Sequence, residues 1–178
     1  MWRPPASPTA ATPLLKVRGR GWRFINVTFD CPVDAAALYL ERNALSDVSE
    51  YDASHTQVIN CKFASGKYAI EDNGGNSYVW VMDNQFYGMS TCAIANTSTS
   101  VANPLNWHIE GNTFVPDNAG GGVGSAAHID SPFSAAHIVH NIFGTVTSTG
   151  IYIDLTGGVA GNVVSYNILG GVYDTTDY

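Results

Sequence analysis

Positive charge is missing from most of this 178-residue chain. No lysine or arginine occurs between Tyr68 and Tyr178, where nine aspartates and glutamates stand, whereas residues 1–23 carry five basic residues and no acid. Charged residues make up 13% of the chain, about half of the ~25% that is usual in globular proteins. Because proteins bind nucleic acid mainly through Lys and Arg contacts with phosphates, we expect no nucleic-acid partner.

Long apolar runs and a paired set of cysteines are missing as well. No run approaches the ~20 apolar residues that cross a bilayer, so we expect no membrane partner. The three cysteines are an odd number without a CxxC pair, which indicates neither a disulfide framework nor a zinc site. We expect reduced structural thiols, no bound metal and no cofactor.

A short phrase recurs along the chain in place of helical apolar spacing. It consists of an apolar residue, an asparagine three positions later and a Phe or Leu two positions after that. Four copies are complete and two earlier copies lack the asparagine; they span residues 81–86, 109–114, 138–143, 164–169, 24–29 and 58–63. The copies recur after 23 to 34 residues, which is typical of a coil with loop insertions.

Each copy is followed by a second phrase of strand character. These phrases are LYLE (38–41), YAIE (68–71), CAIA (92–95), AHID (127–130), IYID (151–154) and GVYD (171–174). Alternation places their third residue inside, and no unit can bury its apolar face without a neighbour. The sequence therefore predicts an all-β fold: a single-stranded, right-handed parallel β-helix of about six rungs over residues 21–178. An extended, basic, proline-rich arm over residues 1–20 precedes it.

The asparagines of the first phrase fit this architecture. Asparagines that stack at a turn can bond to one another and to the backbone of neighbouring rungs. The predicted ladder consists of Asn84, Asn112, Asn141 and Asn167. We interpret these side chains as structural and not as ligands.

With these phrases in view, the chain resembles the pectate-lyase-like superfamily, especially the β-helical structural and tailspike proteins of tailed bacteriophages. The opening GWRFINVTFD (21–30) is similar to the first rung of many such proteins. The basic motifs of pectate lyases and the NTD, GHG and RIK signatures of polygalacturonases do not occur. The resemblance therefore implies a fold and a three-fold assembly, without either of those two activities.

The last residue of the second phrase provides candidate chemistry. Alternation places Asp130 and Asp154 on the outer face, one rung or ~4.8 Å apart, with His128 and Tyr152 two residues earlier on the same face. Such a carboxylate pair suits glycoside hydrolysis, with His128 relaying a proton and Tyr152 stacking on a sugar ring. The same carboxylates could instead cap turns, or bind a cation or a carbohydrate without turnover.

The outer positions of the first phrase indicate self-association. Aliphatic side chains and one tryptophan follow one another down a single sheet, and a monomer does not usually leave such a surface in water. The residues of this apolar stripe are Ile25, Ile59, Trp80, Met82 and Val139. His108 and His137 share the outer column of Trp80 and are interpreted as surface or interface histidines. We expect a homotrimer, as the resemblance implies.

The basic arm indicates a docking segment. Its prolines forbid a helix, and an extended basic segment suits an acidic protein surface. We expect it to dock on a capsid or other virion protein through Arg3, Lys16, Arg18, Arg20 and Arg23.

Together these features predict a non-enzymatic phage virion structural protein. We expect a trimeric capsid decoration or cement protein on the virion surface, assembled in the host cytoplasm. The alternative is a tailspike-like β-helix that binds or depolymerises a cell-surface glycan through Asp130, Asp154 and His128.

Overall fold

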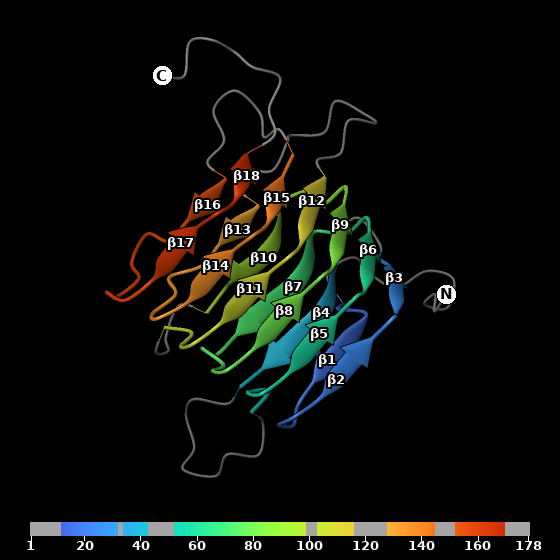
Figure 1. Cartoon of the computed structure of the whole chain (residues 1–178). Coiled ribbons are helices and arrows are strands. Elements are labelled where there is room, and N and C mark those ends of the chain that lie inside the picture. Colours follow the sequence, from blue (N-terminus) through green and yellow to red (C-terminus); the bar gives the residue numbers. More distant parts are fainter. Residues whose placement is uncertain are drawn as a thin grey trace.

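Three parallel sheets of six strands each make up the protein in the computed structural model (Figure 1). The structure describes residues 12–31, 34–42, 52–98, 103–115, 128–144 and 152–169. Within those ranges every regular element is a β-strand and every strand pairs in parallel. The prediction of an all-β parallel β-helix of about six rungs is confirmed.

The strands are short, and each sheet collects one strand from every rung. Sheet 1 consists of β1 (Leu15–Val17), β4 (Ala36–Glu41), β7 (Tyr68–Asn73), β10 (Cys92–Asn96), β13 (Ile129–Asp130) and β16 (Ile153–Asp154). Sheet 2 consists of β2 (Arg23–Ile25), β5 (Gln57–Ile59), β8 (Trp80–Met82), β11 (His108–Glu110), β14 (His137–Val139) and β17 (Val163–Ser165). Sheet 3 consists of β3 (Thr28–Asp30), β6 (Lys62–Ala64), β9 (Gln85–Tyr87), β12 (Thr113–Val115), β15 (Ile142–Phe143) and β18 (Ile168–Leu169).

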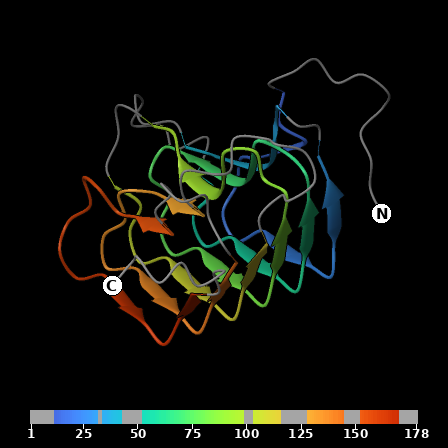
Figure 2. The ribbon, with the colours of Figure 1, turned by 90° about the horizontal axis from the view of Figure 1, so that it is seen from above.

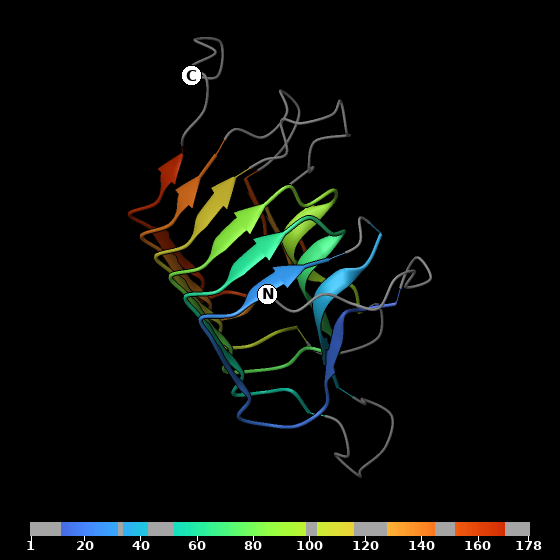
Figure 3. The ribbon, with the colours of Figure 1, turned by 90° about the vertical axis from the view of Figure 1, so that its right-hand side faces the viewer.

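The chain visits the three sheets in a fixed order, so each circuit adds one strand to every sheet. Seen from above, the strands follow one another from blue at the N-terminal end to red at the C-terminal end (Figure 2). The view from the side shows the same order in the sheets that surround the core (Figure 3). Position in the sequence therefore becomes position along the axis, at ~4.8 Å per rung.

Identical inward positions pack against one another from rung to rung. Neighbouring phenylalanine rings of sheet 3 stack with centroids 4.6 to 5.1 Å apart. This column consists of Phe29, Phe63, Phe86, Phe114 and Phe143. Each stacked pair contributes about 0.5–1.5 kcal/mol beyond the burial of its apolar area. The last residue of the repeated phrase thus supplies this column of the core.

The predicted asparagine ladder is present at the corner between sheets 2 and 3. Asn112 shows its pattern: Nδ2 donates to the Val81 carbonyl at 2.8 Å, and Oδ1 accepts from the Asn84 amide at 2.9 Å. Asn112 Nδ2 also lies 3.0 Å from Asn141 Oδ1, and the Asn141 side chain repeats these contacts with Asn167 one rung later. The ladder satisfies buried backbone groups that face no strand partner at the corner.

A left-handed bend precedes each position of the ladder. The bend residue has a φ of 56° at Asp83, 69° at Gly111, 57° at His140 and 56° at Tyr166. Glycine adopts this conformation freely, whereas it is uncommon for residues with a side chain, and more so for tyrosine than for aspartate or histidine. The corner therefore holds His140 and Tyr166 in a backbone conformation that these residues rarely adopt.

The structure differs from the sequence-based expectation in one strand register and in the start of the β-helix. Matching LYLE with YAIE position by position predicts that Leu40 pairs with Ile70. In the structure Leu38 pairs with Ile70 and Glu41 with Asn73, a shift of two residues. Leu38 and Leu40 both point inward, and alternation cannot distinguish a slip of two residues. At the N-terminal end, β1 belongs to sheet 1, so the β-helix begins before residue 21. The expected phrase at 171–174 lies outside the described residues.

The three cysteines are free and buried, as expected for structural thiols. Burial, and after it the charge of Asp30, raise the pKa of Cys31 to about 11. Burial also raises the pKa of Cys61 and of Cys92. These thiols are therefore protonated and unreactive at neutral pH.

The carboxyl group of Asp72 is almost fully buried in the β-helix. Asp72 of β7 is 1% exposed and accepts hydrogen bonds from the side-chain amides of Asn76 and Asn96. Burial raises the pKa of Asp72 to about 6, although these hydrogen bonds oppose the shift. The folded state therefore carries a carboxyl group that ionises close to neutral pH.

Replacing Asn112 tests the ladder. We expect Asn112→Ala to lower the free energy of unfolding by about 2–4 kcal/mol, because the Val81 carbonyl and the Asn84 amide lose their partner. Asn112→Asp should cost more, since its carboxylate cannot donate to the Val81 carbonyl. Urea denaturation measures both, with the exposed Gln85→Ala as control. Equal stability of all three variants would contradict a structural role.

The pH dependence of stability tests the burial of Asp72. Its pKa is raised from 3.8 to about 6 on folding, so protonation favours the folded state. That stabilisation is complete below about pH 4 and is lost as the pH rises through about 6, by at most about 3 kcal/mol. In Asp72→Asn this component should disappear, which the difference between the two stability profiles measures. Parallel profiles would show that Asp72 is not buried.

Candidate functional site

The outer face of sheet 2 carries the predicted apolar stripe. Ile25, Ile59 and Met82 are register partners on consecutive rungs, and Val139 lies further along the same column. Trp80 lies two residues before Met82, in the neighbouring outer column. Ile25 is exposed and the other four are half-buried. The five side chains thus form one surface, although its role in a trimer stays a prediction.

A carboxylate interrupts this stripe. Glu110 stands between Met82 and Val139 in the same column, and Ser165 follows at its C-terminal end. The prediction overlooked both residues, although each copy of the first phrase places them in the column of Met82. Any partner of the stripe must therefore accommodate a charge in its centre.

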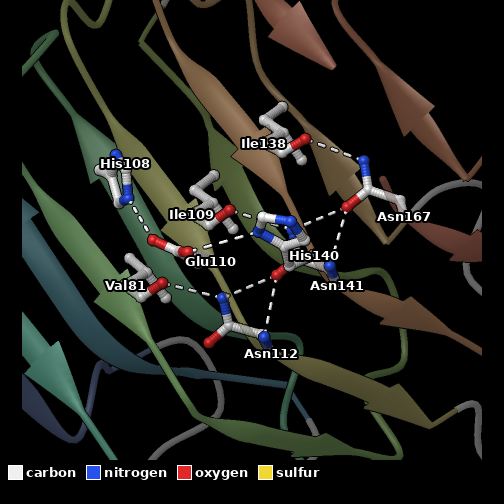
Figure 4. A network of polar contacts seen from close by, with 9 residues as sticks. All are labelled: Val81, His108, Ile109, Glu110, Asn112, Ile138, His140, Asn141 and Asn167. Carbon is white, nitrogen blue, oxygen red and sulfur yellow. Dashed lines mark hydrogen bonds and ion pairs between the residues drawn. The ribbon is translucent and has the colours of Figure 1, made fainter. Parts of the chain in front are cut away.

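Two histidines flank the Glu110 carboxylate (Figure 4). His108 Nε2 lies 2.6 Å from Glu110 Oε2, and His140 Nδ1 lies 3.4 Å from Glu110 Oε1. The hydrogen bond from His108, and to a smaller extent that from His140, hold the pKa of Glu110 below its usual value. The ring of His140 in turn stacks on Tyr166, one rung further, at 5.4 Å. Glu110 thus remains ionised with imidazole partners on both sides.

His108 and His137 are neighbours in one outer column, as predicted. Their rings stack with centroids 5.9 Å apart, but His108 directs Nε2 toward Glu110. In the part of the chain that the structure describes, no three His, Cys, Asp or Glu side chains converge in a way that could hold a metal ion. The pair therefore belongs to the polar edge of the stripe.

Aromatic and imidazole rings near Trp80 stack on one another. His55 and Tyr78, both at left-handed corners, stack 5.0 Å apart with planes within 4°. His55 also approaches Trp80 at 6.3 Å. A sugar ring stacks on a free aromatic face, and the stacking of these side chains on one another reduces the area of such faces.

On sheet 1, Asp130 and Asp154 are register partners, as expected. The hydroxyl and amide of Thr156 donate to Asp154 and hold its pKa below the usual value, the amide bond being 2.9 Å long. Partial burial and, after it, the charge of Asp154 raise the pKa of Asp130. One carboxyl group is thus biased toward ionisation and its neighbour toward protonation.

The expectation that His128 shares this outer face is wrong. His128 is 4% exposed, its Nε2 bonds to the Gly144 carbonyl at 2.9 Å, and its ring packs beside Phe114 and Phe143, with centroids 5.6 and 5.8 Å away. Burial lowers the pKa of His128, so the imidazole stays neutral. The amides of His128 and Ile129 both donate to the Tyr152 carbonyl, and this shared acceptor interrupts the alternation on which the expectation rested.

Tyr152 is also turned toward the core. Its ring is half-buried and meets Phe143 edge-on, with centroids 6.4 Å apart. It lies 6.2 Å from the His128 ring. The structure therefore brings the two aspartates together on the surface, while His128 and Tyr152 pack beneath them.

The basic residues of the first rung engage the second rung. Arg18 Nε lies 2.6 Å from Glu41, and Arg20 Nε lies 2.7 Å from Asp52. Arg23 donates to Gln57 at 2.7 Å, and the Lys16 ammonium lies 5.6 Å from the Tyr39 ring centroid. Arg3 lies outside the described residues. Docking through these side chains stays a prediction.

Comparisons of the chain with protein-family models, with curated proteins and with solved structures find no match. The observation that agrees with the resemblance is therefore the architecture itself, three stacked parallel sheets. In the described ranges no helix is long and apolar enough to cross a membrane.

Proposed function

We propose that this protein is a non-enzymatic structural component of a phage virion, a trimeric decoration or cement protein. In this proposal it lies on the virion surface after assembly in the host cytoplasm. The observation that carries the proposal is the apolar stripe on sheet 2, in which Ile25, Ile59 and Met82 align on consecutive rungs and Val139 follows beyond Glu110. A related member of the pectate-lyase-like superfamily would have the same parallel architecture.

The chemistry of the stripe supports self-association. Stacked aliphatic and indole side chains lose water contacts when a second copy covers them, at about 25 cal/mol per Å² of apolar area. Glu110, in the middle of the stripe, already has two imidazole partners and so needs fewer from a neighbouring copy. Around a three-fold axis the same stripe of each copy meets its neighbour in a closed assembly.

The basic first rung supports docking on an acidic virion protein. Lys16, Arg18, Arg20 and Arg23 lie on the first rung, whereas no Lys or Arg occurs after Lys67. Positive charge at one end of the β-helix favours a single orientation on an acidic particle surface and a salt-sensitive attachment.

A second candidate function is binding or depolymerisation of a cell-surface glycan. The pair Asp130 and Asp154 favours it, because neighbouring carboxyl groups with pKa values shifted in opposite directions can divide the roles of acid and base. The buried His128 is not available as the proton relay on the surface.

The mass of the protein in solution tests the trimer. We expect light scattering on the purified chain, extrapolated to low protein concentration, to give three times the monomer mass. Met82→Glu should weaken association at least about tenfold, because it places an unpaired charge in the stripe. The matched control is Ile142→Glu, an exposed aliphatic position on sheet 3, which should leave the trimer intact. A monomeric wild type, or equal effects of both variants, would overturn the trimer.

Glycan cleavage separates the two candidate functions. Under the first proposal, the wild-type protein, Asp130→Asn and Asp154→Asn release no reducing ends from host-surface polysaccharide. Cleavage by the wild type that either variant abolishes would replace the structural proposal with the enzymatic one. Folding of both variants is verified by their thermal melting.

A further inference from the structure

Core positions are exposed at the C-terminal end of the part of the β-helix that the structure describes. Val164 of β17 and Leu169 of β18 occupy inward columns, yet they are 48% and 58% exposed. At the opposite end, Phe24 and Phe29 occupy the same two columns and are 8% and 3% exposed. These two inward columns are therefore buried at the N-terminal end but exposed at the last described rung, where Asn167 lies between Val164 and Leu169.

The N-terminal end is covered in part by its own tryptophan. Trp22 precedes β2 in the inward column that continues with Thr56 and Val79, as the hydrogen bonds from rung to rung show. Its ring stacks on Phe24 at 6.0 Å, with planes within 8°. Trp22 is still 52% exposed, so an indole surface remains at this end.

The two ends carry opposite charge. Residues 12–31 hold four basic side chains, Lys16, Arg18, Arg20 and Arg23, and one acid, Asp30, while Glu41 and Asp52 of the second rung pair with Arg18 and Arg20. The described residues from 128 onward hold Asp130 and Asp154 and no Lys or Arg. Because the rungs stack in sequence order, this uneven distribution becomes a polarity along the axis.

We propose that the C-terminal end face, formed by Val164, Asn167 and Leu169, binds the N-terminal end face of a second copy, formed by Trp22 and the basic residues around it. This contact is distinct from the stripe on sheet 2. Indole and aliphatic surfaces meet at its centre, and opposite charges meet around it.

Strand direction favours this head-to-tail arrangement. Among the described residues the outermost strands are β1, β2 and β3 at one end and β16, β17 and β18 at the other. When the C-terminal end of one copy meets the N-terminal end of the next, the strands remain parallel, as they are between rungs. A tail-to-tail contact would bring two acidic ends together, so it is opposed by charge. Each head-to-tail contact leaves one further end of each kind, so copies can add in a row.

Sedimentation velocity over a range of concentrations tests the contact. We expect the mass to grow with concentration and the growth to weaken at high ionic strength. Leu169→Glu should lower the association constant by about 10- to 100-fold, since it replaces a buried aliphatic contact with a charge. The matched control is Ile168→Glu, one residue earlier on the outer face of sheet 3, which should have little effect.

Mixing two disabled variants distinguishes the orientation. Leu169→Glu retains a functional N-terminal end, and Trp22→Glu retains a functional C-terminal end. Neither should extend alone, but their mixture should form a complex that stops after one such contact. If Trp22→Glu alone associates as the wild type does, the contact is not head-to-tail and the proposal fails. It also fails if Leu169→Glu and Ile168→Glu behave alike, or if association is independent of concentration. Thermal melting of each variant verifies that it is folded, and Met82→Glu reports the stripe separately.

Discussion

Hydrogen bonds between asparagines on successive rungs hold the register on which the rest of the molecule depends. The side-chain amides of Asn84, Asn112 and Asn141 each bond both to the preceding rung and to the following one, as Asn112 does with Val81 and Asn141. A slip of one residue would break these bonds and turn the inward phenylalanines toward solvent. The polar ladder and the apolar columns therefore specify the same stacking, which explains why such short strands suffice.

Because the register is fixed, residues at the same outward position of each repeat lie together on the surface. Side chains at one outward position lie in a line, ~4.8 Å apart, along the whole axis. On sheet 2 this line is the apolar stripe with Glu110 between His108 and His140, and on sheet 1 it brings Asp130 beside Asp154. In the axial direction the same order separates positive from negative charge. The proposed contacts between copies therefore use the outer face of sheet 2 and the two ends of the β-helix.

Much of the fold follows from the sequence because the repeat is regular where the core is regular. The phrase with Asn and Phe predicts sheets 2 and 3, the ladder and the apolar stripe. Departures arise where alternation is ambiguous or interrupted. Leu38 and Leu40 of β4 are both inward, so the pattern does not distinguish the observed register from one two residues away, and the shared carbonyl of Tyr152 turns His128 inward. Glu110 was overlooked because its neighbours in the column are apolar.

Cross-linking of paired cysteines tests the register most directly. The account predicts that the double variant His108→Cys with His137→Cys forms a disulfide on mild oxidation, since register partners on adjacent strands lie within the ~4.4–6.8 Å that a disulfide spans. His108→Cys with Val139→Cys should remain reduced, because its Cα atoms are two residues out of register and about 8 Å apart. The buried native thiols do not compete. Equal cross-linking in both variants, or cross-linking only in the second, would contradict the stacking described above.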